Sequence, residues 1–319
     1  MKRFWHVREL STVAILLLEI IFFGWYLWPD GNRPHPFLNA ENALLILKYS
    51  SIYGIAAVGA AIVIISGGID LAPGSIIALA SVACGALFVD AGWGLGASLA
   101  AGLVVGLGAG AVSALLIVVV KLPPFIATLG VMGITRGLAF IITEGRYFDL
   151  SSRLAGGWRP LGVPADWVAP LVMVGLAIVF QLLMTRFQWG RQIFSIGGNE
   201  TAALFSGVAV GRIKTSVYLL SGLLAAVAGV VLALVQGQGK ADLATGYELD
   251  IIASAVVGGA SLSGGRGSVM GAVLGTLIFG VLRNALPQIP GATFYDRLIV
   301  GLAVIVIVVM DQLLLKRGE

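Results

Sequence analysis

The polar stretch from Gly197 to Gly207 is the part of this chain whose residue types best suit a defined role. Asn199 is a good helix N-cap, because its side-chain oxygen can accept a backbone N–H that the first helical turn leaves without a partner. Glu200 follows at a place where the helix dipole favours a negative charge. A short capped helix between apolar segments has nothing to bury in lipid, so we predict that it contacts another protein.

The sequence carries none of the motifs that ATP binding or covalent catalysis requires. No segment matches the phosphate-binding pattern G-x-x-x-x-G-K-[ST], a nucleophile elbow or the zinc motif H-E-x-x-H. His6 and His35 lie far apart, and no carboxylate cluster joins them. We therefore predict no catalytic residue, no metal site and no cofactor in this chain, which would not be an enzyme. If ATP drives its action, a partner subunit binds the ATP.

The composition is that of an integral membrane protein. Of the 319 residues, 58% are hydrophobic and 11% are charged, and the mean hydropathy is +0.99. Soluble domains carry about 25% charged residues. Apolar runs of about 20 residues predict an all-α polytopic membrane protein, with residues 1–319 as a single transmembrane domain. The expected spans, about ten by this length criterion, cover residues 11–28, 43–66, 74–90, 94–120, 123–143, 167–186, 214–236, 249–263, 268–286 and 294–315.

Charge sets the expected orientation of these spans. An even number puts both termini on one side, and placing the N-terminus inside leaves more Lys and Arg in the inner segments than in the outer ones. Under the positive-inside rule, this pattern favours cytoplasmic termini. Segment 187–213, which contains the polar stretch, is then cytoplasmic, and 144–166 is the longest outer loop.

Two glycine pairs break the apolar pattern. Gly67-Gly68, followed by Asp70, separates the second and third spans, and Gly258-Gly259 separates the eighth and ninth. Six spans lie between the two breaks, so both should face the same side. They are either tight turns or interruptions of helices beside a transport pathway, where freed backbone groups line a cavity. We expect Asp70 to cap the next helix rather than to contact a substrate.

Four polar or aromatic residues within the expected spans are candidates for lining a pathway. A charge such as that of Arg136 costs about 2.5–3.5 kcal/mol at the bilayer centre, so its guanidinium either bonds backbone carbonyls or faces a cavity. Phe125, Thr128 and Asn284 add an aromatic ring, a hydroxyl and an amide, which together would suit a polyol. Plain packing is the alternative role for each of the four.

Several segments together resemble a known family. They are Ile65–Leu71, Leu122–Gly130 with Arg136-Gly137, Gly190–Gly207, Tyr247–Leu249 and Gly258–Ser268. Over roughly residues 40–310 the chain resembles the membrane permease subunits of ABC importers of the ribose, xylose, arabinose and autoinducer-2 type. The resemblance implies a vitamin B12-importer-like permease architecture in the bacterial cytoplasmic (inner) membrane, and import of a monosaccharide or related polyol.

The resemblance also implies partners. They are an ABC ATPase subunit, a periplasmic or lipoprotein sugar-binding protein, a second permease copy or paralogue, and the lipid bilayer, with no role for nucleic acid. In this family the segment that matches 197–207 is the coupling helix that sits in a groove of the ATPase, which gives Asn199, Glu200, Ala203 and Gly207 an ATPase-coupling role. Phe205 departs from the family, which often has a basic residue there.

The sequence is also compatible with three other functions. A branched-chain amino acid or nucleoside ABC permease shares a related architecture. A secondary carrier that works alone is an alternative from another class, although such carriers usually show a denser Asp, Glu and His relay across their spans. A membrane enzyme is the third alternative, and the lack of a catalytic constellation disfavours it.

Overall fold

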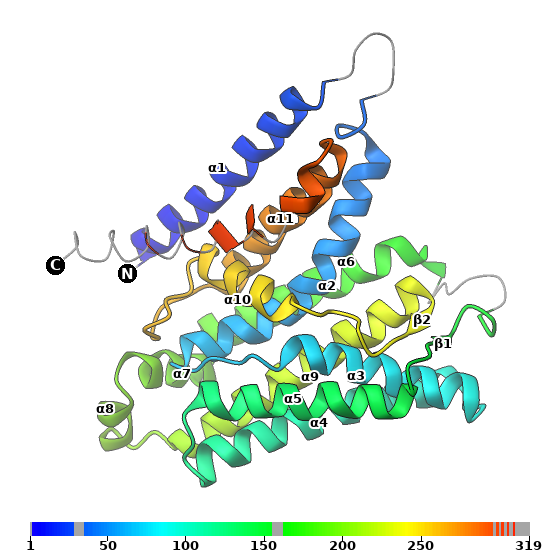
Figure 1. Ribbon diagram of the computed structural model, residues 1–319. Coiled ribbons are helices and arrows are strands. Elements are labelled where there is room, and N and C mark those ends of the chain that lie inside the picture. Colours follow the sequence, from blue (N-terminus) through cyan, green and yellow to red (C-terminus); the bar gives the residue numbers. More distant parts are fainter. Residues whose placement is uncertain are drawn as a thin grey trace.

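Long helices make up most of the described chain. The computed structural model describes residues 2–28, 35–154 and 162–295, with 298–299, 301–302, 305 and 309. Figure 1 shows the helices packed side by side, with α7 and α8 projecting at one end of the bundle. The elements are α1 (Lys2–Tyr26), α2 (Ala40–Ile65), α3 (Pro73–Gly85), η1 (Ala86–Asp90), α4 (Leu95–Ala114), η2 (Leu115–Val119), α5 (Pro124–Thr143), β1 (Phe148–Asp149), α6 (Ala165–Arg186), α7 (Gln188–Gly198), α8 (Glu200–Phe205), α9 (Val210–Gln236), β2 (Gln238–Gly239), α10 (Tyr247–Val257), α11 (Val269–Ala285), η4 (Leu286–Gln288) and η5 (Ala292–Tyr295).

Local sequence chemistry explains several helix starts. The Asn39 side chain caps α2 by accepting the Asn42 N–H at 2.7 Å, and Ser268 caps α11 by accepting the Gly271 N–H at 3.1 Å. Proline opens α3 and α5, where its missing N–H is no loss because the first turn has no partner for it. These caps fix where the apolar runs of the sequence become helical.

The all-α membrane fold expected from composition is confirmed. Within the described residues, 7 helices are long and apolar enough to cross a membrane, and α1 adds the shorter apolar stretch Leu10–Tyr26. The expected last span, 294–315, falls largely outside the described residues. Part of the expected outer loop 144–166 does too, since 155–161 are not described.

The expected span at 249–263 is wrong in its bounds. Helix α10 has 11 residues, which gives a length of about 16 Å against a hydrocarbon core of about 30 Å. The chain turns at Gly258 and Gly259, the latter with φ +96°, before α11 begins. Helix α10 alone is therefore too short to cross the bundle, and the crossing also needs the non-helical residues 240–246 that precede it. The polar and glycine residues of this segment are typical of a loop.

Helix α2 forms the centre of the bundle. It contacts α6, α9, α10 and α11, and its residues from Ser50 to Ile65 are all buried. Helices α4, α5 and α6 bury a much smaller share of their apolar surface and present large side chains outward. Such faces suit contact with lipid or with another membrane subunit.

Glycines spaced four residues apart, Gly106 and Gly110 in α4 and Gly271 and Gly275 in α11, pack helices of this chain against each other. A Cβ atom at Gly106 would overlap the Gly222 carbonyl of α9, and one at Gly110 would overlap the Tyr218 carbonyl. In the same way Gly275 of α11 lies directly against the Ser254 backbone of α10. Small residues let backbones approach this closely, so these repeats serve packing within the subunit.

Two crossings of the bundle combine a non-helical stretch with a helix. After α2 ends at Ile65, residues 66–72 run without helix beside α9 before α3 begins. After α9 ends, β2 pairs with β1, and residues 240–246 lead into α10, which returns toward Ile65. The two non-helical stretches lie at opposite ends of the bundle, and the two helices begin close together where Gly74 packs against Ala244 and Glu248.

Candidate functional site

The N-terminus of α8 has the cap that the sequence predicts. Asn199 is extended, with φ −162°, and its side-chain oxygen accepts the Ala202 N–H at 2.9 Å. The carboxylate of Glu200 binds Lys214 Nζ at 2.6 Å, which ties the start of α8 to the first turns of α9. Because the Glu200 side chain is 54% exposed, this ion pair sits at the surface of the hairpin that bears α8, which consists of α7, α8 and the first turns of α9.

The C-terminus of α8 is closed by a Schellman motif. Gly207 takes the left-handed conformation, with φ +83°, and the Val208 N–H donates to the Ala203 carbonyl at 3.1 Å. Ala203 is 1% exposed and packs with Ile196 and Val210 in a small apolar cluster. The six-residue helix is therefore held rigidly although it lies outside the main core.

The outer face of α8 is apolar and exposed. The Phe205 side chain is 86% exposed and Leu204 is 58% exposed. A large aromatic side chain this exposed at the tip of a rigid, capped hairpin is a feature of contact surfaces. Of the four residues expected to act in coupling, Ala203 is buried inside this hairpin, and the other three shape its two ends.

Helix α5 holds both non-helical stretches in place. Thr128 is fully buried, and its hydroxyl accepts the Leu71 N–H at 3.2 Å and lies 3.3 Å from the Ile69 carbonyl. Two turns further along α5, Arg136 donates to the carbonyls of Ala241 (2.6 Å) and Leu243 (2.8 Å). Arg136 was expected either to bond backbone carbonyls or to face a cavity, and in the structure it bonds backbone carbonyls.

Asp70 sits inside the first non-helical stretch. Its carboxylate is 4% exposed, accepts the Ala72 N–H at 2.9 Å and accepts the Ser221 hydroxyl at 2.7 Å. The bond to Ala72 is an Asx turn immediately before α3, so Asp70 prepares the chain to enter that helix. Freed backbone groups in this stretch are thus bonded to side chains.

The remaining candidates lie apart from this centre. Phe125 is half-exposed on the outer side of α5. Asn284 of α11 exchanges two amide hydrogen bonds with Asn42 of α2, at 2.9 and 2.8 Å. The structure does not gather Phe125, Thr128, Arg136 and Asn284 around one cavity.

Sequence reasoning missed a buried ion pair. Arg283 of α11 donates to the Asp250 carboxylate of α10 at 2.7 Å, and the Asp250 side chain is 2% exposed. The rings of Tyr53 in α2 and Tyr247 in α10 lie nearby, with their centroids 4.2 Å apart. The sequence signal was available, because Asp250 falls within an apolar run where an ionised group needs a partner.

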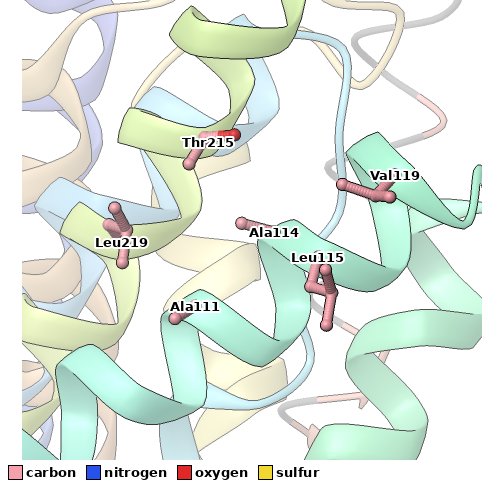
Figure 2. A pocket seen from close by; sticks show the side chains of 6 residues that line it. All are labelled: Ala111, Ala114, Leu115, Val119, Thr215 and Leu219. Carbon is pink, nitrogen blue, oxygen red and sulfur yellow. The ribbon is translucent and has the colours of Figure 1, made fainter.

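An apolar pocket opens beside the hairpin that bears α8. Figure 2 shows the two helical segments that border it, α4 with η2 on one side and α9 on the other. The Thr215 hydroxyl already donates to the Gly211 carbonyl at 2.9 Å, so the lining offers few polar groups. The lining residues are Ala111, Ala114, Leu115, Val119, Thr215 and Leu219. In the described residues, no group of three or more His, Cys, Asp or Glu could hold a metal ion.

The chain matches known transport proteins over nearly its whole length. Residues 42–309 match the family model described as the branched-chain amino acid transport system permease component. The chain is 37% identical to the ribose import permease of Bacillus subtilis (strain 168) over 283 residues, which are 86% of each chain.

Two relatives from Escherichia coli (strain K12) extend this likeness. The ribose import permease is 36% identical over 316 residues, covering 97% of this chain and 94% of the relative. The D-allose transport system permease protein is 31% identical over 318 residues, covering 98% and 94%. No solved structure matches the chain. A family match over this range, with relatives that align from end to end, means that the chain belongs to the ABC importer permease family that includes the ribose import permeases.

Proposed function

We propose that this chain is the membrane-spanning permease subunit of an ATP-driven, binding-protein-dependent importer of a monosaccharide or related polyol. It forms the translocation pathway, while a separate ABC ATPase subunit hydrolyses ATP and a sugar-binding protein delivers the cargo. The subunit pairs with a second permease copy or a paralogue in the bacterial inner membrane, with both termini cytoplasmic. Its own residues move the sugar without covalent chemistry.

Helix α8 is the proposed contact with the ATPase, and it carries the assignment. Its ends are fixed by the Asn199 cap and the Gly207 turn, and Ala203 anchors it to the hairpin. A rigid helix can pass on a push, whereas a flexible loop would absorb it. The exposed Leu204 and Phe205 give this helix an apolar tip that a groove in the ATPase would cover.

The Phe205→Ala variant tests this contact. Truncation of an anchor residue costs about 2 kcal/mol or more, which is roughly 30-fold in Kd for the partner. We expect the purified permease to lose affinity for the ATPase subunit by about this factor, and ATP-driven uptake in proteoliposomes to fall. Phe22→Ala is the matched control, because Phe22 is also exposed but lies on the apolar face of α1. Equal affinity in Phe205→Ala and the unaltered protein would refute the contact.

The substrate class rests on the relatives, which are named as ribose import permeases and a D-allose transport system permease. The description of the matching family model favours branched-chain amino acids as the second candidate. Uptake of labelled pentoses, hexoses and branched-chain amino acids, each with the binding protein that accompanies this permease, separates the two. Saturable uptake of leucine but of no sugar would overturn the sugar assignment. Uptake that needs no ATPase subunit would instead establish a secondary carrier.

A further inference from the structure

Four glycines bring three distant segments into direct backbone contact at the α8 end of the bundle. They are Gly67 just after α2, Gly197 at the end of α7, and Gly264 and Gly265 in the turn between α10 and α11. We call this set the glycine junction. Figure 1 shows the end of α7 close to the end of α2, where the non-helical stretch toward α3 begins.

At Gly197, Gly264 and Gly265, the contacts within the glycine junction leave no room for side chains, whereas Gly67 has space for a Cβ atom. The Gly265 N–H donates to the Ile65 carbonyl at 2.9 Å. A Cβ atom at Gly197 would overlap both the Ile65 carbonyl oxygen and the Gly265 nitrogen. A Cβ atom at Gly264 would lie 2.7 Å from the Gly197 carbonyl oxygen and 3.0 Å from the Gly67 Cα. The segments therefore contact each other through backbone atoms, and no side chain lies between them that could change its rotamer to absorb a displacement.

Each segment of the junction leads to a part of the proposed transport machinery. Gly197 lies three residues before the first residue of α8, and only Gly198 and the capping residue Asn199 intervene. Ile65 and Gly67 open the non-helical stretch 66–72, and Gly264 and Gly265 follow the turn that ends α10. The end of α7 thus touches one end of each of the two crossings that combine a non-helical stretch with a helix.

We propose that the glycine junction transmits movement of α8 to these two crossings, with Gly197 and Gly265 as its positioning residues. This inference rests on the proposed function, because it takes α8 as the point where the ATPase acts. Close-packed protein passes on displacements because it is nearly incompressible. A junction made of backbone alone passes on a shift of α7 most directly. A side chain inserted there would separate the three segments and break the transmission.

The first test compares two neighbouring glycines of α7. Both have ordinary helical φ, so alanine meets no backbone strain at either. The Gly197→Ala methyl collides with Ile65 and Gly265, whereas a Cβ atom at Gly198 has nothing within 4 Å. In proteoliposomes that contain the ATPase and the loaded binding protein, we expect Gly197→Ala to lower uptake per ATP hydrolysed about tenfold, within the usual range of coupling effects. Gly198→Ala should match the unaltered protein.

A second pair tests the junction from the α10–α11 turn. Gly265 and Gly67 have φ of +71° and +82°, a conformation that asparagine tolerates better than other side chains. A Cβ atom at Gly265 would lie 2.7 Å from the Gly198 Cα, whereas the nearest atom to one at Gly67 lies at 3.6 Å. We expect Gly265→Asn to lower uptake per ATP about as much as Gly197→Ala, and Gly67→Asn to have a much smaller effect.

The ratio of uptake to ATP hydrolysis separates transmission from mere packing. A packing defect lowers the amount of folded protein and both activities together, so normal ratios in Gly197→Ala and Gly265→Asn would overturn the inference. Failure of both variants to accumulate, while their controls do, would make the junction a folding contact and would also overturn it. Phe205→Ala in the same assay tests the proposed function separately. If only Phe205→Ala lowers uptake, the junction inference alone fails; if none of the three does, the role of α8 fails as well.

Discussion

Breaking the ion pair between Asp250 and Arg283 by substitution of one partner should strongly destabilise the bundle. The pair joins α10 to α11 at 2.7 Å, and its carboxylate is 2% exposed while the guanidinium is 32% exposed. Two unit charges about 4 Å apart attract by about 4 kcal/mol at the effective dielectric typical of proteins. Removal of one partner also leaves the other charge buried, so the Asp250→Asn or Arg283→Gln variant should lose about 3–5 kcal/mol.

A second ion pair in the same chain provides the matched control. Lys48 and Asp166 also meet at 2.7 Å, but the Asp166 side chain is 53% exposed. Pairs open to solvent contribute about 0–1 kcal/mol, because water screens the charges and the side chains lose freedom. Because both ion pairs have the same N–O distance but differ in the burial of the carboxylate, comparing them isolates the effect of desolvation on stability.

Thermal unfolding of the purified permease in detergent measures the difference. At about 2 °C per kcal/mol for a protein of this size, Asp250→Asn should lower the Tm by about 6–10 °C and Asp166→Asn by about 2 °C at most. The double variant Asp250→Leu with Arg283→Met should recover most of the loss, since an apolar pair leaves no charge buried. A fall in Tm no larger for Asp250→Asn than for Asp166→Asn would refute the argument. So would a double variant that is less stable than either single one.

Three further substitutions follow from close contacts and turns. Gly106→Leu places a side chain on the Gly222 backbone and should cost about 3 kcal/mol or more; the yield of monodisperse protein checks this, with Gly108→Leu, which has open space around it, as the tolerated control. Thr128→Val removes the acceptor of the Leu71 N–H and should lower the free energy of unfolding by about 1–3 kcal/mol, measured as a fall in Tm that Thr128→Ser does not reproduce. Gly207→Ala forces alanine to φ +83° at about 1–2 kcal/mol; limited proteolysis should then cut near α8 faster, while the Tm of the bundle stays unchanged.

The sequence predicted local features of the α8 hairpin well. The Asn199 cap was predictable because it depends on residues three positions apart, and the cap bond to Ala202 is observed. The prediction that both glycine breaks face one side is also confirmed, since Gly264 approaches Gly67. That prediction needed only an even number of crossings between the two breaks. An error in the bounds of one span does not change this number.

The role of residues 240–246 in a crossing could not be predicted, because hydropathy detects apolar length and not direction. Residues 240–246 contain Lys240, Asp242 and Gly246, a composition typical of a loop. They nevertheless lead from the end of α9 back into the bundle toward α10. Arg136 of α5 holds them there by hydrogen bonds to two of their carbonyls. A contact between residues more than a hundred positions apart leaves no trace in the pattern of either segment.

Helix α5 links the two non-helical stretches energetically. A buried stretch without helical bonds leaves N–H and C=O groups that lipid cannot satisfy, and each such group costs several kcal/mol. Thr128 meets this need for residues 66–72, and Arg136 meets it for residues 240–246. Because both side chains belong to one rigid helix, a shift of α5 would change the hydrogen bonds of both crossings together. The mostly exposed helix α5 therefore controls the two least regular parts of the core, while the glycine junction touches the far ends of the same two crossings.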